Sequence, residues 1–252
     1  MTRPVFTVDE RGHTRDYLLR KARSDSRIVA GASVGSDALG GSDRWSDLDL
    51  TFGLADRAIV TEVLADWTAD LKHEFEAAHL FDLTDRTIVY RVFLLPGNLQ
   101  VDLSFTPGFV AEFGPRFKLL FGNAVKREHS PPASARDLFG MGVHHAVRAR
   151  YCLERDRRWQ AEYWISGVRD QSLSLACLRR GLEASHARGF DRLPQDVLEL
   201  ASDTLVHSLE RAELLRALDR SIELLVQEAE EVRDFAAQLA PQLRDLVSTE
   251  WP

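Results

Sequence analysis

Residues 34–52, VGSDALGGSDRWSDLDLTF, contain the pattern that decides the fold of this 252-residue chain. The segment ends in an apolar run that includes Asp47 and Asp49, two positions apart. Side chains two apart on a β-strand point to the same face, so the two carboxylates share one face and the intervening leucines take the other. Neighbouring carboxylates repel each other unless a cation lies between them. The segment therefore predicts a strand with a core face and a metal-binding face.

The first half of the segment adds a phosphate-binding turn to this metal site. Residues 27–32, RIVAGA, have the composition of a short buried strand, after which Gly35 permits a sharp turn. Ser36 then opens a short helical segment whose free backbone N–H groups, together with the Ser36 hydroxyl, are suited to phosphate. Arg44 and Ser46, just before the acidic strand, are further candidates for holding phosphate. Because Mg²⁺ prefers oxygen ligands and keeps positions open for phosphate oxygens, Mg²⁺ is the expected ion.

A third carboxylate comes from a predicted β-hairpin. Residues 87–95 and 99–105 are apolar and β-branched, and the Pro-Gly-Asn sequence between them is a strong turn signal. In the second strand, apolar residues alternate with Asp102 and a serine, so Asp102 faces away from the core. There it joins the first two carboxylates across neighbouring strands as a metal ligand; the alternative is a solvated strand carboxylate.

These residues resemble the signature of the DNA polymerase β-like nucleotidyltransferase superfamily. The resemblance covers residues 15–107 and rests on the Gly-Ser turn, Asp47-x-Asp49 and the later strand Asp102. It implies transfer of a nucleoside monophosphate from a nucleoside triphosphate to a hydroxyl, with release of pyrophosphate. Two Mg²⁺ ions would be bound by the three carboxylates, which form the catalytic set, and the triphosphate by Gly35 and Ser36.

A second resemblance lies further along the chain. Residues 163–170, YWISGVRD, followed by LRRG at 178–181, look like the helical C-terminal domain of antibiotic nucleotidyltransferases, such as aminoglycoside and lincosamide adenylyltransferases. This resemblance implies ATP as co-substrate, transfer of AMP, an aminoglycoside-like acceptor and a role in antibiotic resistance. The acceptor's identity, the base preference and the oligomeric state are not readable from the sequence.

The predicted helix at 158–180 carries the remaining candidate site residues. Glu162, Arg169 and Asp170 are spaced so that they share one side of this helix. A guanidinium suits triphosphate oxygens, so Arg169 is the nucleotide candidate, and the two carboxylates are candidates for binding the acceptor. The alternative for this side is an ordinary solvated helix face.

Composition limits the partners. A net charge of −7 and a pI near 5.6 argue against a nucleic-acid-binding surface and suit a cationic acceptor. Two cysteines in predicted helices indicate no disulfide framework. The first ten residues have no apolar signal core, and no run of about 18 apolar residues occurs, so we expect a cytoplasmic protein that does not bind membranes.

The expected fold is α+β, a small mixed-sheet nucleotidyltransferase domain followed by an all-α helical bundle. The predicted domains are a catalytic domain at 1–115, a junction rich in proline and glycine at 116–133 and a helical substrate-binding domain at 134–252. The expected helices are 7–23, 57–76, 135–154, 158–180, 194–209 and 212–239, and the expected strands are 27–32, 47–54, 81–83, 87–95 and 99–105.

Two other functions remain open. The chain is alternatively a protein-modifying or antitoxin-type nucleotidyltransferase whose helical domain binds a protein partner. A further alternative is an interaction module that binds a nucleotide but catalyses no reaction. The presence of all three carboxylates favours an active enzyme over the inert module.

Overall fold

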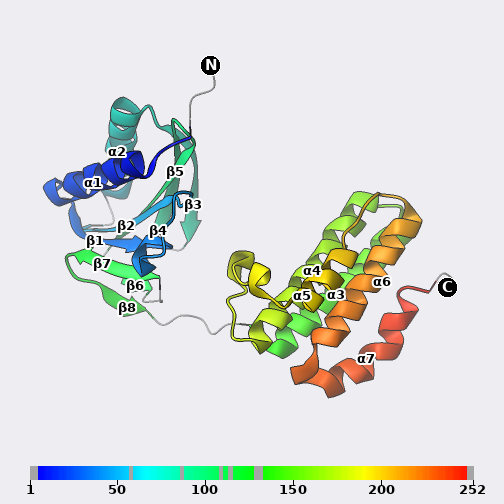
Figure 1. Cartoon of the computed structure of the whole chain (residues 1–252). Coiled ribbons are helices and arrows are strands. Elements are labelled where there is room, and N and C mark those ends of the chain that lie inside the picture. Colours follow the sequence, from blue (N-terminus) through cyan, green and yellow to red (C-terminus); the bar gives the residue numbers. More distant parts are fainter. Residues whose placement is uncertain are drawn as a thin grey trace. The chain divides into compact units, whose positions relative to one another are not determined.

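The computed structural model describes residues 5–56, 59–85, 88–107, 110–112, 116–127 and 133–248. The chain forms two compact units, Met1–Ser130 and Pro131–Pro252, which are labelled by element in Figure 1. The first unit contains a mixed sheet with helices and the second is helical, so the fold is α+β, as the sequence predicts. Residues 57 and 87, where two expected elements begin, lie outside the described ranges.

The first unit is built on a six-stranded sheet with the order β3-β4-β5-β2-β1-β7. The β2 and β5 strands are parallel and the other neighbours are antiparallel. The expected hairpin is present between β4 and β5, with Gly97 (φ 80°) and Asn98 (φ 64°) in its turn. The strands of this sheet are β1 (Ile28–Val34), β2 (Leu48–Leu54), β3 (Ala78–Asp85), β4 (Ile88–Leu95), β5 (Leu99–Pro107) and β7 (Phe117–Phe121).

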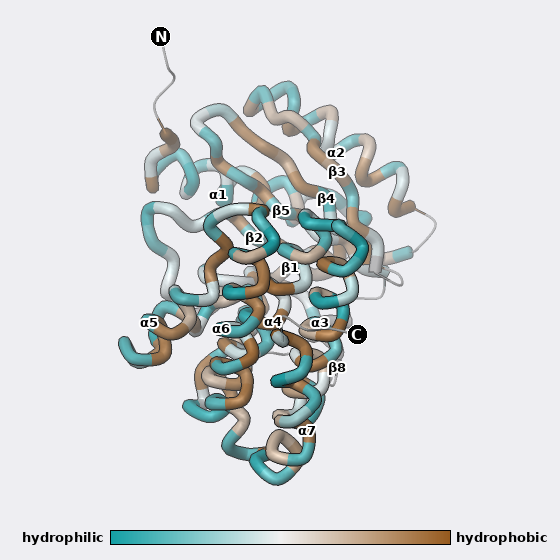
Figure 2. The backbone as a smooth tube through the Cα atoms, turned by 90° about the vertical axis from the view of Figure 1, so that its right-hand side faces the viewer, coloured by the Kyte–Doolittle hydropathy of each residue, from teal (hydrophilic) through white to brown (hydrophobic). Residues whose placement is uncertain are grey.

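Two helices, α1 (Val8–Ser24) and α2 (Val60–Phe75), pack on one face of this sheet. The start of α1 is the predicted capping box: the Glu10 backbone N–H donates to the Thr7 hydroxyl at 3.1 Å, and the Thr7 N–H donates to the Glu10 carboxylate at 2.7 Å. In α2, Trp67 packs against Phe52 and Phe105 of the sheet, with ring centroids 5.0 and 5.3 Å apart. Figure 2 shows hydrophilic and hydrophobic positions alternating along α2, as expected for a helix with one buried face.

The region expected to be a junction contains further strands. β7 pairs with β1, and β6 (Val110–Glu112) pairs with β8 (Val125–Arg127) in a small parallel sheet. The first compact unit consequently extends to residue 130, beyond the boundary expected at 115. Prolines and glycines cluster around these short strands, so the sequence there does not have the pattern of a strand. The strand β7 is stabilised by its pairing with β1, which lies in another segment of the chain.

The second unit is a helical bundle around one main core. Its two longest helices, α3 and α4, match the expected ranges to within one residue. The expected helix at 194–209 ends earlier, where the buried Thr204 hydroxyl donates to the Ala201 carbonyl at 2.6 Å. The helices are α3 (Ala135–Glu154), α4 (Arg158–Arg179), α5 (Gln195–Asp203), α6 (Arg211–Glu228) and α7 (Arg233–Asp245).

The single helix expected at 212–239 is wrong, because it is broken between α6 and α7. At Ala229 the backbone leaves the helical region (φ −80°, ψ 30°), and a 3₁₀ turn at Glu230–Val232 follows. Ala229 is only 2% exposed, and Ala236 and Leu243 of α7 belong to the same core as α6. The break therefore lets both helices bury an apolar side in one core. None of the helices in the described ranges is both long and apolar enough to cross a membrane.

An ion-pair cluster at the start of β1 gives the first unit a pH-dependent stability. The Asp25 carboxylate accepts hydrogen bonds from the Arg27 side chain at 2.9 Å and from the Trp67 indole at 3.2 Å. These bonds, of which those from Arg27 have the larger effect, lower the pKa of Asp25 to about 2. A carboxylate with a lowered pKa stabilises the folded state above pH 4, and this contribution is lost as the pH falls towards 2.

We expect Asp25→Asn to lower the free energy of unfolding at pH 7 by about 2 kcal/mol, the value that corresponds to this pKa shift for a mostly buried carboxylate. Urea unfolding of the wild type and the variant, repeated between pH 7 and pH 2.5, measures the difference. It should shrink progressively below pH 4. A difference that is constant with pH would show that the ionised form of Asp25 contributes nothing to stability.

Candidate functional site

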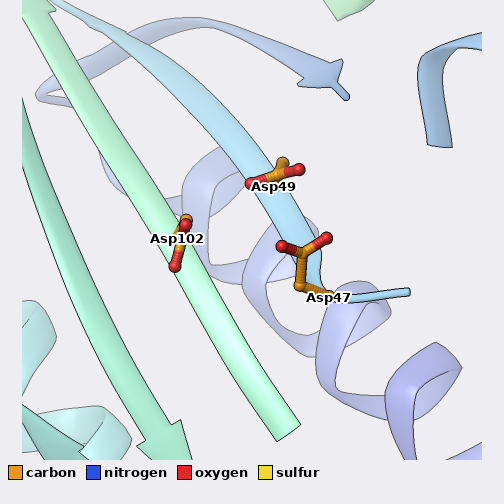
Figure 3. Close-up of side chains that lie close together, drawn as sticks. All are labelled: Asp47, Asp49 and Asp102. Atoms are coloured by element: carbon orange, nitrogen blue, oxygen red, sulfur yellow. The ribbon is translucent and has the colours of Figure 1, made fainter. Parts of the chain in front are cut away.

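Three carboxylates converge on one face of the sheet in the first unit. Asp49 and Asp102 are direct partners across the parallel β2–β5 pair, and Asp47 lies just before β2. Each of the three offers an oxygen atom, and these oxygens all lie within 4.8 Å of one another (Figure 3). The structure therefore brings together all three carboxylates that the sequence pointed to.

The register of β2 and β5 explains this convergence. Leu48 and Leu50 of β2 are partnered by Val101 and Leu103 of β5, and all four side chains are at most 1% exposed in the core. Because side chains alternate along a strand, burying these four turns the aspartates between them to the opposite face. Core packing thus places the two carboxylates side by side in spite of their mutual repulsion.

The electrostatics of the cluster fit a cation. Burial raises the pKa of Asp102, the charge of Asp47 raises it further, and hydrogen bonds from Gln100 act in the opposite direction. The Gln100 amide Nε2 donates to both oxygens of Asp102 at 3.1 Å. A divalent cation would remove the repulsion among three half-exposed carboxylates, and an oxygen-only donor set is the one that Mg²⁺ prefers. The residues present therefore fit a magnesium site.

The Gly-Ser turn lies directly against this cluster. Gly35 has a φ of +69°, which glycine adopts without strain, and a Cβ at this position would collide with the Asp49 carboxylate. Ser36 follows and precedes a short 3₁₀ turn at Asp37–Leu39. Both conformation and close approach therefore require glycine here, and the turn holds Ser36 next to the strand that carries Asp49.

The loop before β2 holds the other two phosphate candidates. The Ser46 hydroxyl accepts a hydrogen bond from the Asp43 backbone N–H at 2.9 Å and donates to the Asp43 carboxylate at 3.0 Å, so it closes a turn within the loop. The Arg44 guanidinium lies 4.5 Å from the centroid of the Trp45 ring, which is 67% exposed. Ser46 thus has a structural role in the loop, and the Arg44 side chain lies at the surface.

The three candidates of the second unit lie along α4. Glu162 accepts a hydrogen bond from the Ser166 hydroxyl at 2.8 Å, and the Arg169 Nε lies 4.0 Å from the Asp170 carboxylate. Tyr163, 65% exposed, extends the polar and aromatic character of this helix. Within the helical unit these residues offer both carboxylates and an aromatic ring to a ligand.

Two side chains near the carboxylates were missed by the sequence analysis. Gln100 lies two positions before Asp102 and bonds to it. Because side chains alternate along a strand, the sequence alone places Gln100 on the same face of β5 as Asp102. Arg11 contacts the loop before β2 through hydrogen bonds to Ser46 and Ser42. The signal for Arg11 is a charged residue on the side of α1 that also carries the apolar Leu18, Leu19 and Ala22.

Comparison with known proteins gives similarity in structure only. No protein-family model matches the sequence, and no curated protein matches it. One similar solved structure is an aminoglycoside 6-adenyltransferase from Bacillus subtilis, with 13% identity, a TM-score of 0.40 and coverage of 93% of this chain and 97% of that one. Another is a nucleotidyltransferase-like protein from Exiguobacterium sibiricum 255-15, with 15% identity, a TM-score of 0.36 and coverage of 94% and 81%.

Both TM-scores are below 0.5, so any activity of the chain has to be argued from its own side chains.

Proposed function

We propose that the protein is a Mg²⁺-dependent nucleotidyltransferase that moves AMP from ATP to a hydroxyl of a small molecule and releases pyrophosphate. The observation that carries the proposal is the convergence of Asp47, Asp49 and Asp102 beside a Gly-Ser turn. Carboxylates arranged around divalent ions next to a phosphate-binding turn are suited to phosphoryl and nucleotidyl transfer.

Each residue of the cluster has a proposed role. Asp47, Asp49 and Asp102 would bind two Mg²⁺ ions, and Ser36 would bind the triphosphate with the backbone N–H groups of its turn. When bound, Mg²⁺ supplies positive charge that polarises the α-phosphate and offsets the charge of the leaving pyrophosphate. Asp102 acts first as a ligand and second as an acceptor for the proton of the attacking hydroxyl.

The helical unit is proposed to bind the acceptor. The carboxylates of Glu162 and Asp170 suit a cationic, hydroxyl-bearing molecule, which supports an aminoglycoside-like antibiotic as acceptor. A protein acceptor is the second candidate. It is favoured by exposed aromatic side chains on the helical unit, with Trp159 77% and Tyr163 65% exposed.

Pyrophosphate release tests the proposal directly. The protein is incubated with Mg²⁺ and each of the four nucleoside triphosphates, over a panel of aminoglycosides, lincosamides and candidate proteins. Acceptor-dependent release with ATP supports the proposed function and names the acceptor class. Release with proteins alone favours the second candidate, and binding of nucleotide without release with any acceptor contradicts an enzyme.

Variants on α4 should separate the two substrates. A carboxylate suits a cationic or hydroxylated acceptor and a guanidinium suits phosphate, so Asp170→Asn should raise the KM for the acceptor and Arg169→Ala the KM for ATP. Each effect should be roughly tenfold, the scale of one charge-assisted hydrogen bond. Steady-state kinetics with each substrate varied in turn measure both values, and Asp203→Asn, at the exposed end of α5, is the matched control. Unchanged kinetics in both variants would assign these residues to a solvated helix face.

A further inference from the structure

An arginine lies on the buried side of α1. Arg11 is only 9% exposed, and the neighbouring buried positions of this helix are Thr14, Leu18, Leu19 and Ala22. Arginine is seldom this buried unless its guanidinium has partners, because removing a charge from water is costly. The partners of Arg11 therefore indicate why the chain has a cation at this place.

The guanidinium of Arg11 contacts three points of a single loop. Its Nη1 donates to the backbone carbonyl of Ser46 at 3.3 Å, and its Nη2 donates to the Ser42 hydroxyl at 3.2 Å. The same Nη2 lies 4.0 Å from the carboxylate of Asp37, which Arg15 also approaches to 3.4 Å. A planar guanidinium presents several donors in fixed directions, so one side chain bonds to separate parts of the loop at once.

This loop, residues 35–47, joins β1 to β2 and consists of two turns. The first closes with a hydrogen bond from the Gly41 N–H to the Ser36 carbonyl at 3.2 Å. The second closes from the Ser46 N–H to the Asp43 carbonyl at 3.3 Å. Arg11 contacts the first turn at Asp37, the second at Ser46, and Ser42 between them. The loop begins at the Gly-Ser turn and ends at Asp47, so the same loop carries two parts of the candidate site.

We propose that Arg11 is a positioning residue that holds loop 35–47 in the geometry required to bind Mg²⁺ and a nucleoside triphosphate. The proposal rests on the function proposed above. Arg11 bonds to the loop through Ser42 and Ser46, and in this role it keeps Ser36 and Asp47 in place beside Asp49 and Asp102. Ordering a loop of this length during binding would cost conformational entropy, and a pre-ordered loop avoids that cost.

A matched control separates positioning from general stability. Arg27 lies in the same compact unit and forms a comparable cluster, with Asp25, Glu62 and Asp66 at 2.7–3.2 Å. Arg27→Met removes a guanidinium and its ion pairs at the start of β1, not at the loop. A purely stabilising role for Arg11 predicts that Arg11→Met and Arg27→Met behave alike.

The first test measures the order of the loop without reference to activity. Arg44 is exposed within the loop, so trypsin cleaves after Arg44 at a rate that reports loop opening. Mass spectrometry measures cleavage at this bond, which should be about tenfold faster in Arg11→Met than in the wild type. The rate should be intermediate in Arg11→Lys, because lysine keeps the positive charge but lacks the several fixed N–H donors of the guanidinium. Arg27→Met should cleave after Arg44 as slowly as the wild type. Equal rates in all variants would overturn the proposal.

The second test measures binding of ATP with Mg²⁺ by calorimetry. Arg11→Met should weaken binding about tenfold, as expected for the loss of one hydrogen bond to a charged group, and Arg11→Lys should recover part of the loss. Arg27→Met should bind as the wild type does. A loosened loop with unchanged binding would overturn the positioning role.

Two further outcomes are informative. If Arg11→Met does not fold, Ser42→Ala removes a single bond of Arg11 at a partly exposed position and should give the same pattern with smaller effects. If the wild type does not bind ATP with Mg²⁺, the proposed function fails, and the nucleotide part of this inference fails with it. Trypsin cleavage then still decides whether Arg11 holds the loop.

Discussion

Asparagine in place of Asp47 or Asp49 is expected to lower pyrophosphate release by at least about a hundredfold, the scale of a key electrostatic group in an active site. Asparagine preserves the shape of the side chain but removes one negative charge from the cluster, and a neutral amide is a weaker ligand for Mg²⁺ than a carboxylate. The fold should survive, because Asp49 lies on the face of β2 opposite the core, Asp47 lies just before the strand, and neither side chain is buried. Steady-state assays with ATP, Mg²⁺ and the acceptor measure the loss, and circular dichroism checks the fold.

Asp66→Asn is the control for this pair of variants. It removes one carboxylate from the same compact unit, at an exposed position on α2 where its partner Arg27 keeps two other carboxylates. The Asp66→Asn variant should release pyrophosphate at the wild-type rate. Near-normal pyrophosphate release from both Asp47→Asn and Asp49→Asn would rule out the metal site at this cluster.

The three carboxylates were predictable from the sequence because alternation along a strand is a local property. In β2 and β5, apolar residues take every second position. The face of the sheet to which an aspartate in these strands points therefore follows from its immediate neighbours. That Asp49 and Asp102 are direct partners depends on the parallel register of the two strands, which a single sequence does not determine. The hairpin before Asp102 and the capping box of α1 were predictable for the same reason, since each depends on residues within one short segment.

The features that were missed depend on contacts between distant segments. Arg11 bonds to residues 31 and 35 positions away, and only the folded chain shows which loop lies beside its helix. The strand β7 is five residues long and pairs with the distant strand β1, a contact that its own short segment does not reveal. The break after α6 depends likewise on the shared core of α6 and α7. Local patterns thus predicted the three carboxylates but not the contacts between distant segments.

Asp102→Asn is expected to have the largest effect on transfer while leaving nucleotide binding largely intact. Asp102 is half-buried on the central strand β5, next to Asp49, and both of its proposed roles require the charged form. As a ligand it must be ionised to bind Mg²⁺, and as a proton acceptor it must be unprotonated when the hydroxyl attacks. A neutral asparagine performs neither role. Ser36 and the remaining two carboxylates still offer ATP and Mg²⁺ a binding site.

Calorimetry with ATP and Mg²⁺, paired with turnover of the same preparations, tests this expectation. Asp102→Asn should bind ATP within about tenfold of the wild-type affinity, the loss expected from one ligand contact, and show almost no transfer. Asp102→Glu is the matched variant, because it keeps the charge but displaces it by one methylene; it should retain more transfer than Asp102→Asn. Substantial transfer by the asparagine variant would remove Asp102 from the active site.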